Sequence, residues 1–257
     1  MSFRRQLSSG PLAGAMLSAG LALVAMSGGC VGNDLSLSIT RFIPPSSGGS
    51  AGACVFDAAS ILNQTRGVWD VEVAKFFPIG YNVNFIVKNN LESKTTTGIE
   101  TQAFYVNSFD VVLVPEGPII AAIPPSRREF NFKSGSIRVG PADSVSAYVE
   151  AIAPDLTAAI AAIPAEPLGL VTVQVRAVGT RGEQETASAY SSFPIEVCKG
   201  CLSNSKAGSF PGCPLPLNTD VLPGNPCNPS QDQGVTCCTP DANKSLLCGN
   251  AAKPPTT

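Results

Sequence analysis

The stretch YNVNFIVK, residues 81–88, places a large apolar side chain at every second position. Tyr81, Val83, Phe85 and Val87 occupy these positions, and the residues between them are polar except for Ile86. Successive side chains of a strand point to opposite faces, so an alternation with period two predicts a β-strand that buries one face. This stretch therefore indicates a β-sheet fold.

Seven later stretches have a similar β-branched and aromatic character, namely IETQAFYV (99–106), FDVVLV (109–114), REFNF (128–132), GSIRV (135–139), SVSAYVEAI (144–152), LVTVQVRAV (170–178) and ASAYSSFPIEV (187–197). Turn-forming residues separate them, as in KNN (88–90), GPAD (140–143) and GTRGE (179–183). This spacing predicts a mainly β domain over 54–197, an antiparallel β-sandwich of Ig-like layout with Trp69 in its core. The Ig-type disulfide is not expected, because the next cysteine after Cys54 is Cys198.

One stretch, PDLTAAIAAIP (154–164), departs from the strand pattern. Its four alanines favour a helix, which Asp155 would cap and Pro164 would end. The sequence therefore predicts one short helix within the β domain.

Cysteines divide the chain into two regions, because seven of the nine lie in residues 198–257. That segment is rich in Pro, Gly, Asn and Ser and poor in large apolar residues, so disulfides must stabilise it. The disulfide candidates are Cys54, Cys198, Cys201, Cys213, Cys227, Cys237, Cys238 and Cys248. The odd number in the tail predicts a link to Cys54, for which Cys198 is the favoured partner. The adjacent Cys237 and Cys238 are expected to bond to two different partners.

The first 29 residues have the organisation of a secretory signal peptide. Arg4 and Arg5 precede an apolar run over residues 11–26, which is shorter than the roughly 20 residues that span a bilayer. Small residues then lead to Cys30, and residues 31–53, which include PPSSGGSAG, are expected to form a flexible tether.

Residues 26–30, MSGGC, resemble the lipobox of bacterial lipoproteins. The resemblance implies that Cys30 becomes the lipidated N-terminus of the mature protein, and Val31 after it favours the outer membrane. Together with SGSIRVGP (134–141), FPIEVCKGCL (193–202) and the cysteine-rich tail, the chain resembles bacterial cell-envelope lipoproteins. This resemblance implies a lipid anchor and a compartment, and it implies no activity.

Several kinds of chemistry are excluded or weakly supported. The chain has no histidine, which excludes histidine-based triads and histidine-liganded metals, and a net charge of −2 without a basic run argues against nucleic acid. No cofactor or metal is expected, and CKGC (198–201) is interpreted as structural disulfide cysteines rather than a redox or zinc motif. Catalysis would have to use a carboxylate pair, Asp70 with Glu72 or Glu183 with Glu185.

The leading functional hypothesis is a non-catalytic lipoprotein that binds or scaffolds another envelope component. The apolar stretch VPEGPIIAAIPPS (114–126) would be its binding ridge if exposed, although packing onto the sandwich is the favoured interpretation. The alternative is a glycan- or peptide-recognition module that uses exposed Tyr81, Tyr105 or Tyr148. A hydrolase that uses the acidic pairs is the third hypothesis.

Overall fold

The computed structural model describes residues 36–48, 53–77, 79–93, 95–96, 99–203, 222, 224–238 and 247–248. Several sequence-based predictions lie outside these residues, namely the signal peptide, the lipidation of Cys30, Cys213 and the side chain of Cys54. The described residues all belong to one compact unit, which spans residues 33–257. Among the described residues, no helix is long and apolar enough to cross a membrane.

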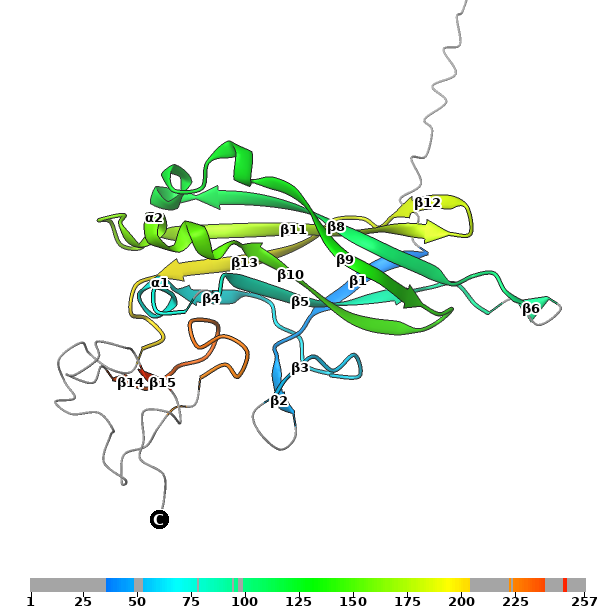
Figure 1. Cartoon of the computed structure of the whole chain (residues 1–257), viewed down its shortest axis with the longest axis horizontal. Helices are drawn as coiled ribbons and strands as arrows, with labels where there is room; N and C mark the ends of the chain where they lie inside the picture. Colours follow the sequence, from blue (N-terminus) through cyan, green and yellow to red (C-terminus); the bar gives the residue numbers. More distant parts are fainter. Residues whose placement is uncertain are drawn as a thin grey trace, which may run out of the picture. The chain divides into compact units, whose positions relative to one another are not determined.

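Strands dominate the described elements, and the helices are short (Figure 1). In chain order they are β1 (Leu37–Phe42), β2 (Ser46–Gly48), β3 (Ala53–Val55), β4 (Gly67–Asp70), α1 (Val71–Ala74), β5 (Tyr81–Asn89), β6 (Thr95–Thr96), β7 (Ile99–Glu100), β8 (Phe104–Glu116), η1 (Gly117–Ala121), η2 (Pro125–Arg127), β9 (Glu129–Val139), β10 (Ser144–Ile152), η3 (Pro154–Leu156), α2 (Thr157–Ala161), β11 (Gly169–Arg181), β12 (Gln184–Ala187), β13 (Ser191–Cys198), β14 (Cys237–Cys238) and β15 (Leu247–Cys248).

Two main sheets form the domain. The smaller has the strand order β1-β5-β10, and the larger has the order β4-β13-β11-β8-β9, with β12 also paired to β11. All the pairings are antiparallel except that of β4 with β13, which is parallel. This arrangement confirms the predicted mainly β fold and adds a parallel edge strand to it.

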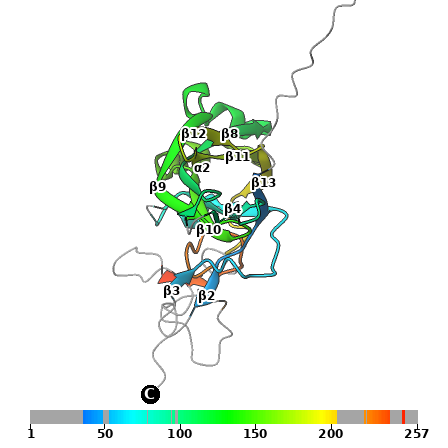
Figure 2. The ribbon, with the colours of Figure 1, turned by 90° about the vertical axis from the view of Figure 1, so that its right-hand side faces the viewer.

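The inward-facing side chains of both sheets form one hydrophobic core. Phe85 of β5 meets Phe109 of β8 edge to face, with ring centroids 5.0 Å apart. Trp69 is fully buried, as predicted. The apolar side chains whose alternation predicted the strands therefore face one shared core. Figure 2 shows the strands nearly end-on.

Three boundaries differ from the sequence-based predictions. Four predicted strands form only two, because β8 and β9 each continue through the predicted break, where their pairing has an irregularity between Val106 and Ser108. The predicted helix is present as η3 followed by α2, but Asp155 is not its cap and instead forms an ion pair with Arg127. Leu37–Phe42, assigned to the tether, form β1, whose apolar residues pack into the core.

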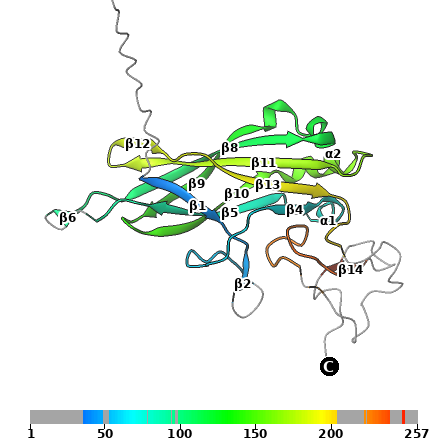
Figure 3. The same cartoon turned by 180° about the vertical axis from the view of Figure 1, so that it is seen from behind.

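The outer edges of the two sheets differ in whether another segment lies beside them. The outermost strands are β1 and β10 in the smaller sheet and β4 and β9 in the larger one. Residues 224–238, which we call the clasp and which are mostly orange in the figures, lie beside β4 (Figures 1 and 3). We call the facing edges of β9, in the larger sheet, and β10, in the smaller sheet, the open edge. It is separate from the edge of β4.

Candidate functional site

The acidic pairs singled out in the sequence do not become matched carboxylates on one strand face. Asp70 ends β4 and is buried, whereas Glu72 lies in α1 and forms an ion pair with Lys75. Glu183 and Glu185 are both exposed, in the turn before β12 and in β12 itself. The predicted two-residue spacing on a strand is therefore wrong for Asp70 and Glu72, because the chain turns into a helix after Asp70.

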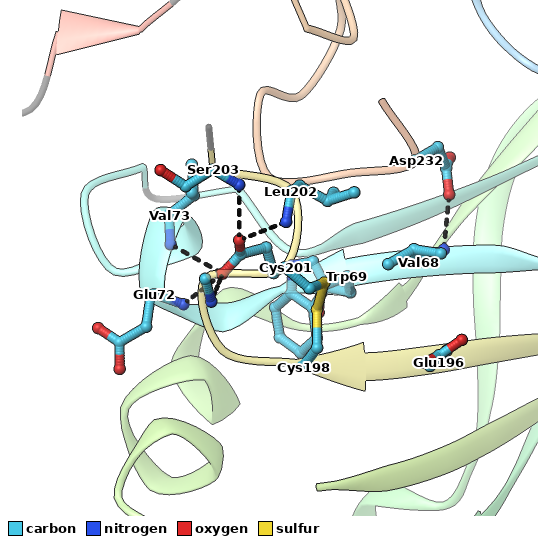
Figure 4. The surroundings of a disulfide bond; sticks show 12 residues. Val68, Trp69, Glu72, Val73, Glu196, Cys198, Cys201, Leu202, Ser203 and Asp232 are labelled. Carbon is cyan, nitrogen blue, oxygen red and sulfur yellow. Dashed lines mark hydrogen bonds between the residues drawn. A yellow bond between two sulfur atoms is a disulfide. The ribbon is translucent and has the colours of Figure 1, made fainter. Parts of the chain in front are cut away.

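Asp70 organises the CKGC segment (Figure 4). Its side-chain oxygens accept hydrogen bonds from five backbone N–H groups at 2.8–3.4 Å, those of Glu72, Val73, Gly200, Leu202 and Ser203. The carboxylate thus caps α1 and holds the loop that contains Cys201. Backbone donors of this kind stabilise a buried carboxylate, which gives Asp70 a structural role.

Cys198 and Cys201 are bonded to each other, with Cα atoms 5.9 Å apart (Figure 4). The favoured link between Cys54 and Cys198 is therefore wrong, because the CKGC loop closes on itself over Asp70. Both sulfur atoms lie within 4.8 Å of an Asp70 oxygen, the spacing of a metal site. The disulfide occupies both sulfurs and the N–H groups occupy the carboxylate, so these residues offer no thiolate ligands.

The described part of the cysteine-rich tail confirms its disulfide character. Cys237 is bonded to Cys248, and the two residues pair across β14 and β15. Cys227 and Cys238 are disulfide-bonded as well. Because Cys248 is bonded to Cys237, the adjacent Cys238 has a different partner, as predicted.

The clasp adds a strand-like segment to the free edge of β4. Asp70 N–H donates to the Ser230 carbonyl and Asp232 N–H donates to the Val68 carbonyl, each at 2.8 Å. These bonds pair Trp69 with Gln231 in an antiparallel bridge. The clasp therefore occupies backbone groups that β4 would otherwise leave unpaired.

Gln231 connects the clasp to the smaller sheet. Its side-chain amide accepts from Asn82 N–H at 3.1 Å and donates to the Asn82 carbonyl at 2.7 Å, as a paired strand would. Asn228 donates to the Gly80 carbonyl at 2.7 Å. These polar side chains are buried, so their hydrogen bonds join the two sheets where β1 no longer pairs with β5.

A buried tyrosine and a half-buried carboxyl group meet at the clasp. The Tyr81 hydroxyl donates to Asp232 Oδ1 at 2.7 Å, and the Val68 N–H donates to the same oxygen at 2.9 Å. Burial raises the pKa of Asp232 above its ordinary value, although these hydrogen bonds oppose the shift. Burial and the neighbouring carboxylate raise the pKa of Tyr81. Tyr81 lies on the buried face, as the strand alternation predicted, so it cannot serve the alternative hypothesis of a glycan- or peptide-recognition module, which needs it exposed.

Strand β10 has a neighbour on one side only. It pairs with β5, and no backbone hydrogen bond among the described residues joins it to a second strand. Its sequence SVSAYVEAI contains neither Pro nor Gly and only one charged residue, Glu150. Proteins usually protect such an edge with charges, prolines, bulges or a covering segment. In β10 the pairing with β5 is irregular only between Glu150 and Ile152, so most of its length is regular.

The facing strand β9 carries several of these protective features. It contains the charged residues Glu129, Lys133 and Arg138, all exposed. Gly135 has a φ of 72°, a left-handed conformation that interrupts the regular edge. The edge of β9 is therefore less suited than that of β10 to accept another strand.

A pocket of about 230 Å³ opens between β9 and β10. Leu113, Phe130 and Phe132 line it from the larger sheet, and Glu150 and Ala151 line it from β10. Ser126, Arg127 and Leu156 complete one end. Pockets that bind ligands typically combine apolar walls with a few polar groups, as this one does.

The charged groups of the pocket differ in their pairing. Arg127 forms an ion pair with Asp155, which joins η2 to η3 beside the pocket. Glu150 accepts a 3.4 Å hydrogen bond from the Gly80 N–H, and no described cation forms an ion pair with it. The pocket therefore offers one carboxylate without a cationic partner among the described residues.

Aromatic rings continue from the pocket along the open edge. Tyr148 of β10 lies between Phe132, with ring centroids 6.0 Å apart, and Phe56, with centroids 6.3 Å apart. Tyr148 is 51% exposed, and Tyr105 of β8 is 43% exposed. Two of the three tyrosines considered for ligand recognition, Tyr105 and Tyr148, are therefore at the surface. They lie on different sheets, the larger and the smaller respectively.

A second hollow, of about 360 Å³, lies between β1 and β13. Polar residues such as Asn63, Gln64 and Ser192 form much of its lining, and its one charged residue, Arg41, donates to the Ala58 carbonyl. It lacks the exposed aromatic rings of the open edge. The pocket between β9 and β10 is therefore the better candidate site.

The apolar stretch 114–126 packs against the core, in agreement with its favoured interpretation. Ile119 and Ile123 are fully buried, and Ile120 is the most exposed of its isoleucines, at 46%. The segment contributes Ser126 to the wall of the pocket. It thus supports the candidate site instead of forming a separate binding ridge.

Comparisons with known proteins provide no family for the chain. No family model and no curated protein matches it. Among solved structures it is similar to a family 123 glycoside hydrolase from Clostridium perfringens that was analysed for glycolipid glycan hydrolysis, with 16% sequence identity and a TM-score of 0.21. The match covers 54% of this chain and 24% of that chain, and a similarity this low carries no argument about function.

Proposed function

We propose that this protein is a non-catalytic binding protein of the bacterial cell envelope. Lipid on Cys30 holds it to a membrane, and the open edge of its sandwich binds another envelope component. The observation that carries this proposal is that β10 has no second strand partner among the described residues and lies beside a pocket lined by Phe130 and Phe132. Apolar surface and unpaired strand edges are both features that bind partners.

Two further observations support a binding role rather than catalysis. The buried Asp70, one of the acidic residues considered for catalysis, is fully engaged by backbone donors. Among the described residues that line the pocket, Glu150 is the only one with a carboxylate, whereas glycoside hydrolysis ordinarily uses a pair.

The anchor follows from the lipobox-like residues before Cys30. It is tested by comparing the wild type with Cys30→Ser in cells fed a clickable palmitate analogue. We expect label and membrane association in the wild type and neither in the variant. Equal membrane association of the two proteins would contradict the anchor.

Binding at the open edge is tested by cross-linking in cells, purification under denaturing conditions and mass spectrometry of the attached material. Ser126→Trp places a large side chain in the wall of the pocket, and Ser136→Trp places it on an exposed part of β9 that does not line the pocket. We expect an abundant adduct with the wild type and Ser136→Trp, and its loss with Ser126→Trp. Unchanged adducts in both variants would refute the proposed site.

A further inference from the structure

We propose that the open edge receives an extended polypeptide segment as an added strand on β10, with a lysine or arginine side chain of that segment in the pocket. This inference rests on the proposed function and specifies the partner of the same site. An extended segment bound in this way would complete the hydrogen bonding of β10.

The backbone of β10 provides the first reason. Ser144 to Glu150 pair regularly with β5, and the pairing becomes irregular between Glu150 and Ile152. No described strand pairs with the side of β10 away from β5. Residues 140–143 join β9 to the first residue of β10, so the added strand would pair with the far half of β10, beside the pocket. A polypeptide strand matches the spacing of the N–H and C=O groups on such an edge, because its own backbone repeats with the same period. An oligosaccharide has no such repeat, so the edge favours a peptide.

The pocket provides the second reason. Alternate side chains of an added strand point to the same face, so one of them can enter the pocket beside Ala151. Phe130 and Leu156 offer apolar walls for the methylene groups of a long side chain. A lysine or arginine can bury this stem while its charged end remains near a polar group.

Charge complementarity selects the cationic side chain. Glu150 has no described cationic partner, whereas the positive charge of Arg127 is already paired with Asp155. A cation from the ligand would therefore face a carboxylate in a partly desolvated place, where ion pairs are stronger than in water. An acidic ligand side chain would face repulsion there.

The neighbouring aromatic rings provide a place for other residues of the same segment. Tyr148 precedes Glu150 by two positions on the same strand, and Phe132 lies beside it. Apolar or aromatic ligand residues can contact these rings and so contribute to affinity.

The test uses the full chain and synthetic peptides based on Thr-Val-Thr-Lys-Thr-Val-Thr, measured by fluorescence anisotropy. The central lysine is replaced by norleucine or glutamate, and a further peptide carries N-methyl groups on alternate amides. Relative to the lysine peptide, we expect about tenfold weaker binding with norleucine and about hundredfold weaker binding with glutamate. The N-methylated peptide should not bind, because it cannot pair with the strand edge.

Protein variants assign the effect to Glu150. Glu150→Gln should reduce the affinity for the lysine peptide to that for norleucine, and Glu129→Gln, an exposed position on β9, should leave it unchanged. Glu150→Lys should reverse the preference and favour the glutamate peptide. This reversal is a gain of binding, so a folding defect cannot mimic it.

Each contrary outcome has a distinct meaning. Equal affinity for all the central residues, or an unchanged preference in Glu150→Lys, would overturn the cationic pocket. Binding of cellohexaose or chitohexaose, lost in Ser126→Trp, with no peptide binding would overturn the peptide inference and leave the proposed function standing. Loss of peptide binding together with unchanged cellular cross-linking in Ser126→Trp would refute both.

Discussion

At the β4 edge of the sandwich, Ser230 and Asp232 of the clasp bond to the strand backbone, and Gln231 reaches Asn82 of the other sheet. At the β10 edge, no described segment makes such bonds, and the space beside the strand is a pocket lined by aromatic side chains. The two edges belong to one domain and one core, yet the described part of the chain covers only the edge of β4.

The contrast matters because an uncovered strand edge favours association with other chains. This protein covers β4 with a segment stabilised by buried hydrogen bonds and disulfides. It protects β9 with charges and a glycine in a left-handed conformation. Strand β10 has one charged residue, Glu150, and one irregularity, between Glu150 and Ile152, and no described segment covers its edge. This weaker protection supports our proposal that the edge binds a partner.

The largest expected effect is on the covered side, at Asp70. Asp70→Ala would leave five backbone N–H groups near the clasp without their acceptor. An unsatisfied buried donor costs about 1–3 kcal/mol, and partial access of water limits the sum, so we expect a loss of about 4 kcal/mol. The measurement is the free energy of unfolding in urea. The control Glu72→Gln, which breaks an exposed ion pair, should cost under about 0.5 kcal/mol.

A smaller effect is expected at Gln231. Gln231→Ala removes the amide that pairs with both backbone groups of Asn82, and we expect a loss of about 2 kcal/mol. Amide hydrogen exchange should accelerate at Asn82 and at Asp70. The exposed neighbour Gln233→Ala is the matched control and should leave exchange unchanged. Equal effects of the two variants would mean that the clasp does not join the sheets.

The third prediction concerns pH. Between the ordinary aspartate value of 3.8 and the raised pKa of Asp232, the folded state holds more protons than the unfolded state. The free energy of unfolding of the wild type, relative to Asp232→Asn, should therefore fall as pH rises through this interval, by at most about 1.4 kcal/mol per pH unit. Parallel pH curves for the two proteins would contradict the raised pKa.

Tyr81 should also make the free energy of unfolding fall as pH rises, in the alkaline range. Its raised pKa keeps the folded hydroxyl protonated above pH 10, where the unfolded tyrosine ionises. The stability of the wild type relative to Tyr81→Phe should therefore fall as pH rises above about 10. The measurement is again unfolding in urea at a series of pH values.

The smallest effect on stability is expected at the open edge. Tyr148 is 51% exposed, so Tyr148→Ala should cost less than about 1 kcal/mol, in the range of a single cross-strand contact. It should nevertheless reduce partner capture in the cross-linking experiment. A large loss of stability with unchanged capture would show that Tyr148 is a structural residue.

The sequence predicted the sandwich because its strands carry their own signal. Val83 and Phe85 alternate with Asn82 and Asn84 whatever their partners are, so the β fold could be identified locally. The boundaries were harder to predict. The sequence was divided into separate strands that end at Phe132 and begin at Gly135, whereas the structure has one long strand, β9, through both.

The clasp could not be predicted, because its partners are distant in sequence. Asn228, Gln231 and Asp232 lie in a polar, cysteine-rich segment of the kind usually found in exposed loops, and they contact residues about 150 positions earlier. The disulfide pairing was likewise undetermined, since spacing alone does not select a partner for Cys198. Tyr148 was a candidate binding residue from the sequence alone. Phe132 and Glu150 could be identified only from the structure, which places β9 beside β10.

The most direct test of the open edge is site-specific photo-cross-linking in living cells. A photoreactive phenylalanine analogue replaces Tyr148 in one variant and Tyr105, an exposed tyrosine on β8, in another. We predict a discrete adduct from position 148 and none from position 105. Adducts of equal yield from both positions, or from position 105 alone, would contradict the claim that the edge beside β10 is the binding surface.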